Sequence, residues 1–219
     1  MTQEPFTLVC FAVKEEAKPF NQLVGSQPQI KVLLTGIGSR NADQAIRSAL
    51  AQQRPDRVLT CGFAGGLRPD LAAGTIVFSA DKETGWEPAL LAAGAQPARF
   101  HCVERVATTA EQKRALWQAT GADAVDMESQ IICAVCREQK IPSAIVRVIL
   151  DTADTNLPFD FNKFLTADRQ VDIPKLTRAA LMSPGKVPAL LRLQQQGKAA
   201  AEKLGQTLAG LLSKADGHA

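Results

Sequence analysis

Residues 141–154 read IPSAIVRVILDTAD. Within this stretch, Ser143–Leu150 is a short, nearly continuous apolar run rich in β-branched residues, which is typical of a strand buried inside a sheet. The run ends at an acid, Asp151, and a second acid, Asp154, follows closely. We therefore expect a buried strand whose carboxyl end carries acidic side chains to one edge of a sheet, where open α/β sheets bind their ligands.

Similar apolar runs alternate with longer helical patterns along the rest of the chain. The expected strands are Leu8–Val13, Lys31–Leu34, Arg57–Cys61 and Thr75–Ser79, and the expected helices are Glu15–Leu23, Ser39–Gln53, Ala110–Thr120 and Met127–Gln139. This alternation predicts an α/β protein in three layers, α/β/α, around a largely buried sheet. A length of 219 residues is typical of one domain, so we expect residues 1–219 to form a single domain.

Composition and charge argue against several classes of protein. Apolar residues make up 46% and charged residues 21% of the chain, which is ordinary for a globular protein and unlike a disordered or membrane protein. The net charge of +3 is small and the basic residues are scattered, so we expect a small-molecule partner and no nucleic acid. The segment Met1–Pro5 carries no basic leader, and we expect a cytoplasmic location.

The cysteines indicate neither a disulfide framework nor a metal site. Their number, five, is odd, and the chain shows no export signal, so we expect reduced thiols. Cys133 and Cys136 form a C-x-x-C within a helical pattern, without a second pair or a nearby histidine to complete a tetrahedral site. We interpret them as buried helix residues, with a metal or redox site as the alternative, and we predict no metal and no cofactor.

Two segments near the C-terminus have more than one interpretation. The tail Lys186–Ser213 spaces its leucines by three and four residues, which predicts a helix with one apolar stripe packed on the body. Basic residues flank the stripe, so a helix that touches a membrane or a partner is the alternative. The loop Pro158–Ile173 contains three phenylalanines among polar residues, which favours a cover over a pocket or a flap of the core.

The candidate catalytic groups are carboxylates, because common enzyme signatures are absent. The sequence has no G-x-x-x-x-G-K-[ST], no G-x-G-x-x-G after a strand and no G-x-S-x-G, and its two histidines are His101 and His218. Acids gather instead where expected strands end and helices begin. They are Glu15, Glu16, Asp126, Glu128, Asp151 and Asp154. Each acid taken alone can also be explained as a helix cap or as a partner of the helix dipole.

Two glycine-containing segments complete the candidate site. Thr35–Ser39 reads TGIGS, and Cys61–Leu67 reads CGFAGGL after an expected strand. Both indicate tight turns in which the backbone comes close either to another part of the chain or to a ligand.

Four stretches in unbroken order resemble the nucleoside phosphorylase and nucleosidase superfamily, and in particular the methylthioadenosine and S-adenosylhomocysteine nucleosidases. They are Val32–Ala42 (VLLTGIGSRNA), Arg54–Val77 (RPDRVLTCGFAGGLRPDLAAGTIV), Ala124–Cys136 (AVDMESQIICAVC) and Ile141–Asp154 (IPSAIVRVILDTAD). The likeness covers roughly residues 8–165, and it is weaker between Ala80 and Ala122. It implies a nucleoside phosphorylase-like fold with a mixed sheet, and an enzyme that cleaves N-glycosidic bonds.

The resemblance also implies roles for individual residues. Asp151 matches the general acid that protonates the purine as its bond to the sugar breaks, and Glu16 matches the glutamate that orients the attacking water. Glu128 matches the carboxylate that holds the ribose hydroxyls, and Met127 matches the residue packed against the sugar. These roles suit an oxocarbenium-like transition state, which needs an acid for the leaving base and negative charge near the sugar. The matching stretches add Asp126, Phe63 and Ala64 as substrate-binding residues.

Three residues depart from the family pattern. Phe63 stands where the glycine segment often carries serine, and Thr60 stands where phosphate-using members place arginine. Both departures favour water over phosphate as the nucleophile. Leu150 replaces a small polar residue that is common beside the acid, so Asp151 lacks one expected hydrogen-bond partner.

We therefore expect hydrolysis of the N-glycosidic bond of a purine nucleoside or another adenosyl compound. One alternative is phosphorolysis of the same bond, with Arg40 or Arg68 holding phosphate, and another is a nucleoside-binding protein without turnover. The presence of Glu16, Glu128 and Asp151 together argues against the last. The family implies a homodimer or larger homo-oligomer.

A narrower resemblance suggests a lipid connection. Thr108–Ser129 and Ser183–Leu193 resemble a branch of the superfamily found with hopanoid biosynthesis, whose members release adenine from an adenosyl lipid. That likeness would bring the C-terminal helix near a membrane.

Overall fold

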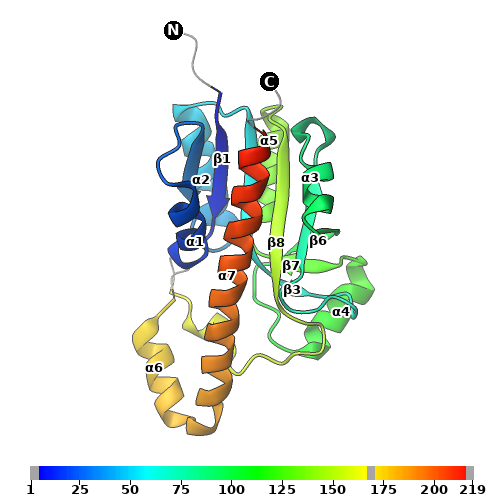
Figure 1. The fold of residues 1–219 in the computed structure, drawn as a ribbon. Helices are drawn as coiled ribbons and strands as arrows, with labels where there is room; N and C mark the ends of the chain where they lie inside the picture. The colour runs from blue at the N-terminus through cyan, green and yellow to red at the C-terminus, as the bar shows by residue number, and fades with distance from the viewer. Residues whose placement is uncertain (1–4, 167–170, 216–219) are drawn as a thin grey trace.

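The computed structural model describes residues 5–166 and 171–215, and it places a mixed sheet between helices (Figure 1). The strands run in the order β2 (Ile30–Leu34), β1 (Thr7–Phe11), β3 (Arg57–Gly66), β8 (Ser143–Asp151), β4 (Ile76–Ala80) and β5 (Gln96–Pro97). Beside this path, β7 (Ala124–Asp126) pairs with β3 and with β6 (Phe100–Cys102). The expected α/β class with a mixed central sheet is confirmed.

The directions of the strands position the candidate site. Strands β2, β1, β3 and β8 are parallel to one another, whereas β4 is antiparallel to β8 and β7 is antiparallel to β3. The carboxyl ends of β1, β3 and β8 therefore lie at the same edge of the sheet. Residues that follow these strands meet there although they are far apart in the chain.

Helices cover both faces of the sheet. One face is covered by α1 (Lys14–Val24), α3 (Glu87–Ala92) and α7 (Val187–Ala215), and the other by α2 (Ser39–Gln52) and α5 (Ser129–Glu138). The larger core joins Phe11, Phe20 and Trp86 with the leucines of α7. The remaining helices are α4 (Ala110–Thr120), α6 (Ile173–Met182) and the short η1 (Lys82–Thr84), η2 (Phe161–Phe164) and η3 (Pro184–Lys186).

The long helix α7 has two parts with different surroundings. Its C-terminal part packs on the body, where Leu204, Leu208, Leu211 and Leu212 are buried, as the packed-helix interpretation predicts. Its first turns project from the body together with α6, to which η3 connects them (Figure 1). None of the residues of α6 is buried. No helix in the described ranges is long and apolar enough to cross a membrane.

The expected turn at Cys61–Leu67 is wrong, because β3 continues through it to Gly66. The segment keeps partners on both sides, with β8 along most of its length and β7 at Gly65 and Gly66. The glycines serve close packing rather than chain reversal. A Cβ at Gly62, where φ is +147°, would lie 2.9 Å from Oε1 of Glu16, and one at Gly65 would lie 3.2 Å from Cγ1 of Val125.

Other differences concern short elements with weak patterns. Asp126 lies at the end of strand β7 rather than at the start of a helix, and α5 begins only at Ser129. Strands β5, β6 and β7 have two or three residues each, too few for an alternating pattern to be recognised. Helices α3 and α6 also have no counterpart among the expected helices.

The two parts of α7 should respond differently to truncation of a leucine. We expect Leu208→Ala, at a position that is 0% exposed, to lower the free energy of unfolding by about 2–5 kcal/mol, because it removes packed methyl groups and leaves a cavity. The control Leu191→Ala, at a position that is 52% exposed, should change it by about 0.5 kcal/mol or less. Urea unfolding of both variants measures the difference, and equal losses would contradict the described packing.

Candidate functional site

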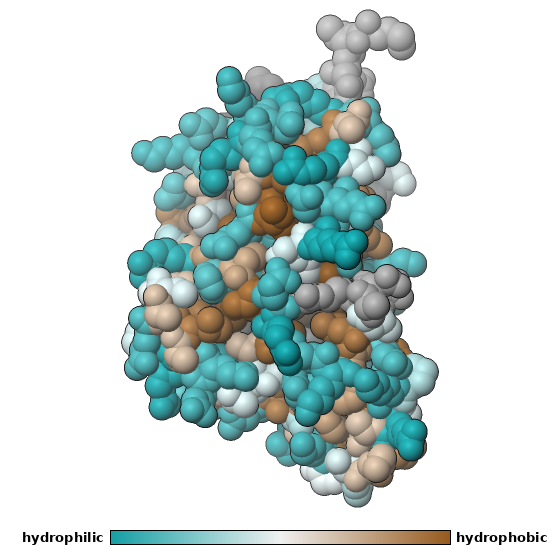
Figure 2. Space-filling view, turned by 180° about the vertical axis from the view of Figure 1, so that it is seen from behind, coloured by the Kyte–Doolittle hydropathy of each residue, from teal (hydrophilic) through white to brown (hydrophobic). Residues whose placement is uncertain are grey.

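A cavity of about 330 Å³ lies at the carboxyl edge of the sheet. It is lined by Ala12, Val13, Glu16, Ile37, Phe63, Ala64, Gly65, Val103, Val106, Ala107, Val125, Asp126, Met127, Glu128, Leu150, Asp151, Leu157, Phe161, Leu165, Val171 and Leu193. Apart from four carboxylates, this lining is apolar. In the view from behind, hydrophobic side chains gather at mid-height between hydrophilic ones (Figure 2). All seven residues predicted as catalytic or substrate-binding line this one cavity.

Glu16 reaches the cavity from the first turn of α1. Its Oε1 accepts a hydrogen bond from the backbone N–H of Phe63, at 3.0 Å, across the space that Gly62 leaves open. No group in the described part of the chain pairs with its buried Oε2. Burial raises the pKa of Glu16, whereas the charge of Arg147 and the backbone hydrogen bonds lower it. One carboxylate oxygen is thus fixed by the backbone, and the other is left for a ligand.

Glu128 is held by the glycine turn that follows β2. Its Oε1 accepts a hydrogen bond from the N–H of Gly38, at 2.7 Å, and Ser39 Oγ donates to the carbonyl of Met127, at 3.1 Å. Gly38 has a φ of +90°, a conformation that glycine adopts without strain. Burial raises the pKa of Glu128 to about 7, against the charge of Arg147 and aided by that of Asp126. The expected role of Thr35–Ser39 as a close-approach turn agrees with this contact.

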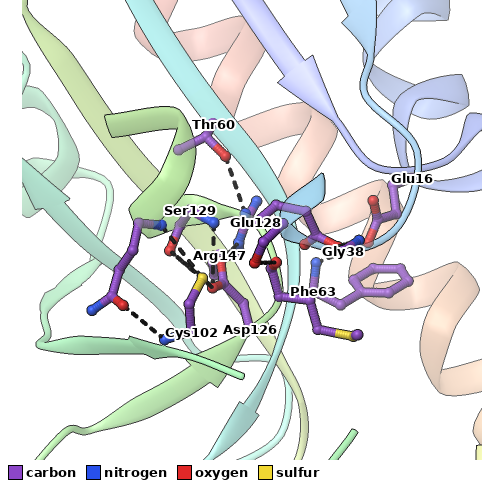
Figure 3. A network of polar contacts seen from close by, with 12 residues as sticks. Glu16, Gly38, Thr60, Phe63, Cys102, Asp126, Glu128, Ser129 and Arg147 are labelled. Carbon is purple, nitrogen blue, oxygen red and sulfur yellow. Dashed lines mark hydrogen bonds and ion pairs between the residues drawn. The ribbon is translucent and has the colours of Figure 1, made fainter. Parts of the chain in front are cut away.

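A buried ion pair lies beneath these two glutamates (Figure 3). Arg147 Nε on β8 donates to Asp126 Oδ2 at 2.8 Å, and Arg147 Nη2 donates to Thr60 Oγ1 at 3.1 Å. The other oxygen of Asp126 accepts from Ser129 Oγ, at 2.9 Å, and from Cys102 Sγ, at 3.0 Å. Asp126 therefore lines the cavity, but its hydrogen bonds are made within the protein.

Asp151 ends β8 and has a lysine as its partner. Lys113, from α4, is 0% exposed at its side chain and forms an ion pair with Oδ2 of Asp151. Burial raises the pKa of Asp151, and the charge and hydrogen bond of Lys113 lower it. Lys113 thus supplies a partner on the carboxyl group that Leu150, in place of a polar residue, does not provide.

The apolar part of the lining comes from two sources. Met127 and Ala64 are buried beside the carboxylates, and Phe63, next to Ala64 in the chain, lines the same cavity. Phe161, from η2 within the 158–173 loop, and Leu193 from α7 also line the cavity. The same loop buries Phe159 and Phe164, whose rings meet edge to face at 5.9 Å. The loop thus both covers the cavity and contributes to the core, within its described residues.

Sequence reasoning missed Arg147 and Lys113. A charged residue in the middle of the apolar run Ser143–Leu150 signals a buried ion pair, and that signal was available for Arg147. For Lys113 no such signal exists, because a lysine in a helical pattern is ordinarily exposed and only the tertiary fold turns it toward Asp151. Arg68, considered above as a phosphate ligand, does not line the cavity and pairs with Asp70 and Asp123 at 2.6 and 3.2 Å.

The site has the electrostatic character of a cation-stabilising pocket. None of its described lining residues is lysine, arginine or histidine, whereas four are acids. Among the described residues, no group of three or more His, Cys, Asp or Glu is arranged to hold a metal ion. The arrangement suits a neutral ligand that develops positive charge as it reacts, with acids on several sides of it.

The chain is similar in sequence to known proteins. Residues 98–181 match the model of the family described as the phosphorylase superfamily. A 5'-methylthioadenosine/S-adenosylhomocysteine nucleosidase from Glaesserella parasuis is 30% identical over 171 residues, which are 62% of this chain and 74% of that protein.

Solved structures share the fold at low sequence identity. The futalosine hydrolase of Helicobacter pylori superposes with a TM-score of 0.71 at 15% identity, over 96% of this chain and 98% of that one. The 5'-methylthioadenosine/S-adenosylhomocysteine nucleosidase of the same organism, with butyl-thio-DADMe-Immucillin-A, gives a TM-score of 0.71 at 15% identity, over 97% and 100%. The chain therefore belongs to the phosphorylase superfamily and is a nucleosidase-type enzyme within it.

Proposed function

We propose that this protein hydrolyses the N-glycosidic bond of a purine nucleoside or another adenosyl compound and releases the base. The single observation that carries this proposal is the composition of the cavity, in which Glu16, Asp126, Glu128 and Asp151 are the charged residues of the described lining. The volume of about 330 Å³ and the largely apolar walls are typical of a small-ligand site.

The acids divide into roles that suit a dissociative cleavage. Asp151 protonates the purine ring as the bond to C1' of the sugar breaks, so that the base leaves neutral. The sugar then resembles an oxocarbenium ion, and the negative charge of Glu128 near the ribose hydroxyls stabilises it. Met127, Phe63 and Ala64 supply the apolar contacts of the bound nucleoside. Asp126 contributes indirectly, because it holds Arg147, whose charge acts on Glu16 and Glu128.

Glu16 provides the nucleophile by accepting a proton from water. Its Oε1 is held by Phe63 N–H, and its free Oε2 can accept a hydrogen bond from a water placed under the sugar. Burial raises the pKa of Glu16, and the charge of Arg147 opposes that rise and so favours the ionised form that a base requires. Oriented in this way, the water attacks C1' as the base departs.

Phosphorolysis fits the cavity less well. A phosphate dianion would enter a site with four acidic side chains and no basic side chain in its described lining, which like-charge repulsion disfavours. Thr60, at the position of the phosphate-binding arginine, is buried and accepts a hydrogen bond from Arg147. Arg40 is exposed and does not line the cavity.

The adenosyl part of the proposal rests on relatives. The nucleosidase from G. parasuis is named for two adenosyl compounds, and we extend that substrate class to this chain. An adenosyl lipid as substrate and a membrane contact through the C-terminal helix stay alternatives. The homo-oligomeric state, the cytoplasmic location and the organisation of residues 1–219 as one domain remain predictions.

We expect Asp151→Asn to stay folded, with lower stability because Lys113 loses its carboxylate partner, and to lose about a hundred- to ten-thousand-fold in kcat, because an amide cannot donate the required proton. Release of adenine from adenosine or methylthioadenosine measures the loss, and circular dichroism checks the fold. Near-normal turnover by the folded variant would remove Asp151 from the mechanism.

We expect Glu128→Gln to impair the cleavage of ribonucleosides more than that of 2'-deoxynucleosides. The carboxylate binds the ribose hydroxyls, and a substrate that lacks one of them has less to lose. The ratio of kcat/KM for adenosine and 2'-deoxyadenosine, in the variant and in the unmodified protein, measures the effect. Equal losses would assign Glu128 a structural role at the Gly38 turn.

The nucleophile is tested by omitting phosphate. We expect full activity in phosphate-free buffer with a free sugar as product, and we expect Glu16→Gln to abolish turnover while nucleoside binding persists. Product analysis by mass spectrometry and binding by calorimetry measure the two effects. A strict need for phosphate, with a sugar 1-phosphate as product, would make the enzyme a phosphorylase. A Glu16→Gln variant that keeps its turnover and loses about 1 kcal/mol or less of stability would place Glu16 outside catalysis.

A further inference from the structure

Lys113 is a buried lysine whose hydrogen bonds all lie at the end of β8. It projects from α4, and its side chain is 0% exposed. Its Nζ donates to the carbonyl of Thr152 at 2.7 Å and to that of Thr155 at 2.9 Å, and it pairs with Oδ2 of Asp151. The three N–H groups of an ammonium thus have two neutral acceptors and one carboxylate.

Holding the residues that follow β8 in place would not by itself require a charged side chain at position 113. Burial of a lysine is costly, and the two carbonyls alone could be satisfied by a neutral donor. The ammonium instead contacts the one carboxyl group that has to carry a proton to the substrate. Lys113 itself does not line the cavity, so any effect on the substrate acts through Asp151.

We propose that Lys113 and Asp151 form one proton-donating pair, in which Lys113 restores to Asp151 the proton that Asp151 gives to the leaving base. The inference rests on the proposed function and adds a residue to it. Lys113 is a positioning residue in this scheme, because it touches neither substrate nor reacting atom.

Protons and electrons balance along the pair. The bond between C1' and the purine nitrogen breaks, its electron pair stays on the purine, and the ring accepts the proton from Asp151. Asp151 Oδ2 takes a proton from Lys113 Nζ, which becomes a neutral amine held by the carbonyls of Thr152 and Thr155. Water forms the new bond to C1' and gives its proton to Glu16. After product release, solvent returns the proton from Glu16 to Lys113.

The pair should hold its proton over a wider pH range than an acid alone. The charge of Lys113 lowers the pKa of Asp151, so at high pH the proton that Asp151 passes to the base is the one that the ammonium holds. Lys113 is the described ionisable group whose charge acts on Asp151, while Glu16, Asp126 and Glu128 line the same cavity. Without the lysine, Asp151 is a lone buried acid and loses its proton at its own pKa, which burial raises.

The experiment compares two substrates that differ in their need for an acid. Adenosine requires protonation of its base, whereas 4-nitrophenyl β-D-riboside releases a stable anion without it. The variants are Lys113→Met, which removes the charge, and Lys113→Arg, which keeps the charge but cannot give up a proton. The control is Lys203→Met, an exposed lysine that donates to the carbonyl of Gly74 at 2.7 Å.

We expect Lys113→Met to lose about a hundredfold or more on adenosine near pH 8 and less than about tenfold on the nitrophenyl riboside. Its loss on adenosine should shrink at lower pH, because Asp151 then takes its proton from solvent. Lys113→Arg should not restore adenosine cleavage, and Lys203→Met should match the unmodified protein on both substrates.

Three results would overturn the pair. They are normal adenosine cleavage by Lys113→Met, an equal and pH-independent loss on both substrates by a folded Lys113→Met, and full rescue by arginine. If neither Lys113 variant folds, the pH dependence of the unmodified protein tests the proposal. Its rate on adenosine relative to the riboside should stay level from about pH 6 to about pH 9, and a fall that begins near neutral pH would refute the pair. Failure of the unmodified protein to release adenine would instead refute the proposed function.

Discussion

The ion pair between Arg147 and Asp126 is the interaction on which the site depends. It joins β8 to β7, and through Thr60 it also reaches β3, so one guanidinium connects three strands below the cavity. Such a pair is costly to bury, but the loss of either partner leaves an uncompensated charge and costs about 3–5 kcal/mol. Its value here is electrostatic as well as structural, because burial raises the pKa of both Glu16 and Glu128 and the charge of Arg147 opposes that rise.

Two cations outside the cavity lining therefore govern the acids within it. Arg147 acts from the sheet on Glu16 and Glu128, and Lys113 acts from α4 on Asp151. Burial alone would favour the neutral form of all three acids. Arg147 counters this effect at Glu16 and Glu128, the two acids that act as anions, without exposing a positive group to the ligand. The cavity thus keeps acids near the sugar and the base while its walls remain largely apolar.

The sequence predicted the parts of this protein that depend on long local patterns. The strands β1, β2, β3, β4 and β8 and the helices α1, α2, α4 and α5 follow from apolar runs and helical spacing, and the site acids follow from motif order. The short strands β5 to β7 carry too few residues for a pattern. The extension of β3 to Gly66 depends on its partner β7, which is distant in the chain. The glycines of this segment therefore predicted a turn where the structure has a strand. The direction in which Lys113 points is likewise a property of tertiary packing alone.

Gly62 has an evolutionary consequence. Its missing side chain leaves the space that Oε1 of Glu16 occupies, and its φ of +147° disfavours any other residue. Position 62 is therefore free to change only in a lineage that no longer needs the carboxylate at position 16. A relative with a larger residue at the position of Gly62 should also have replaced the glutamate. Such paired replacement would mark a change of nucleophile, or a loss of turnover, that could be recognised from sequence before any assay.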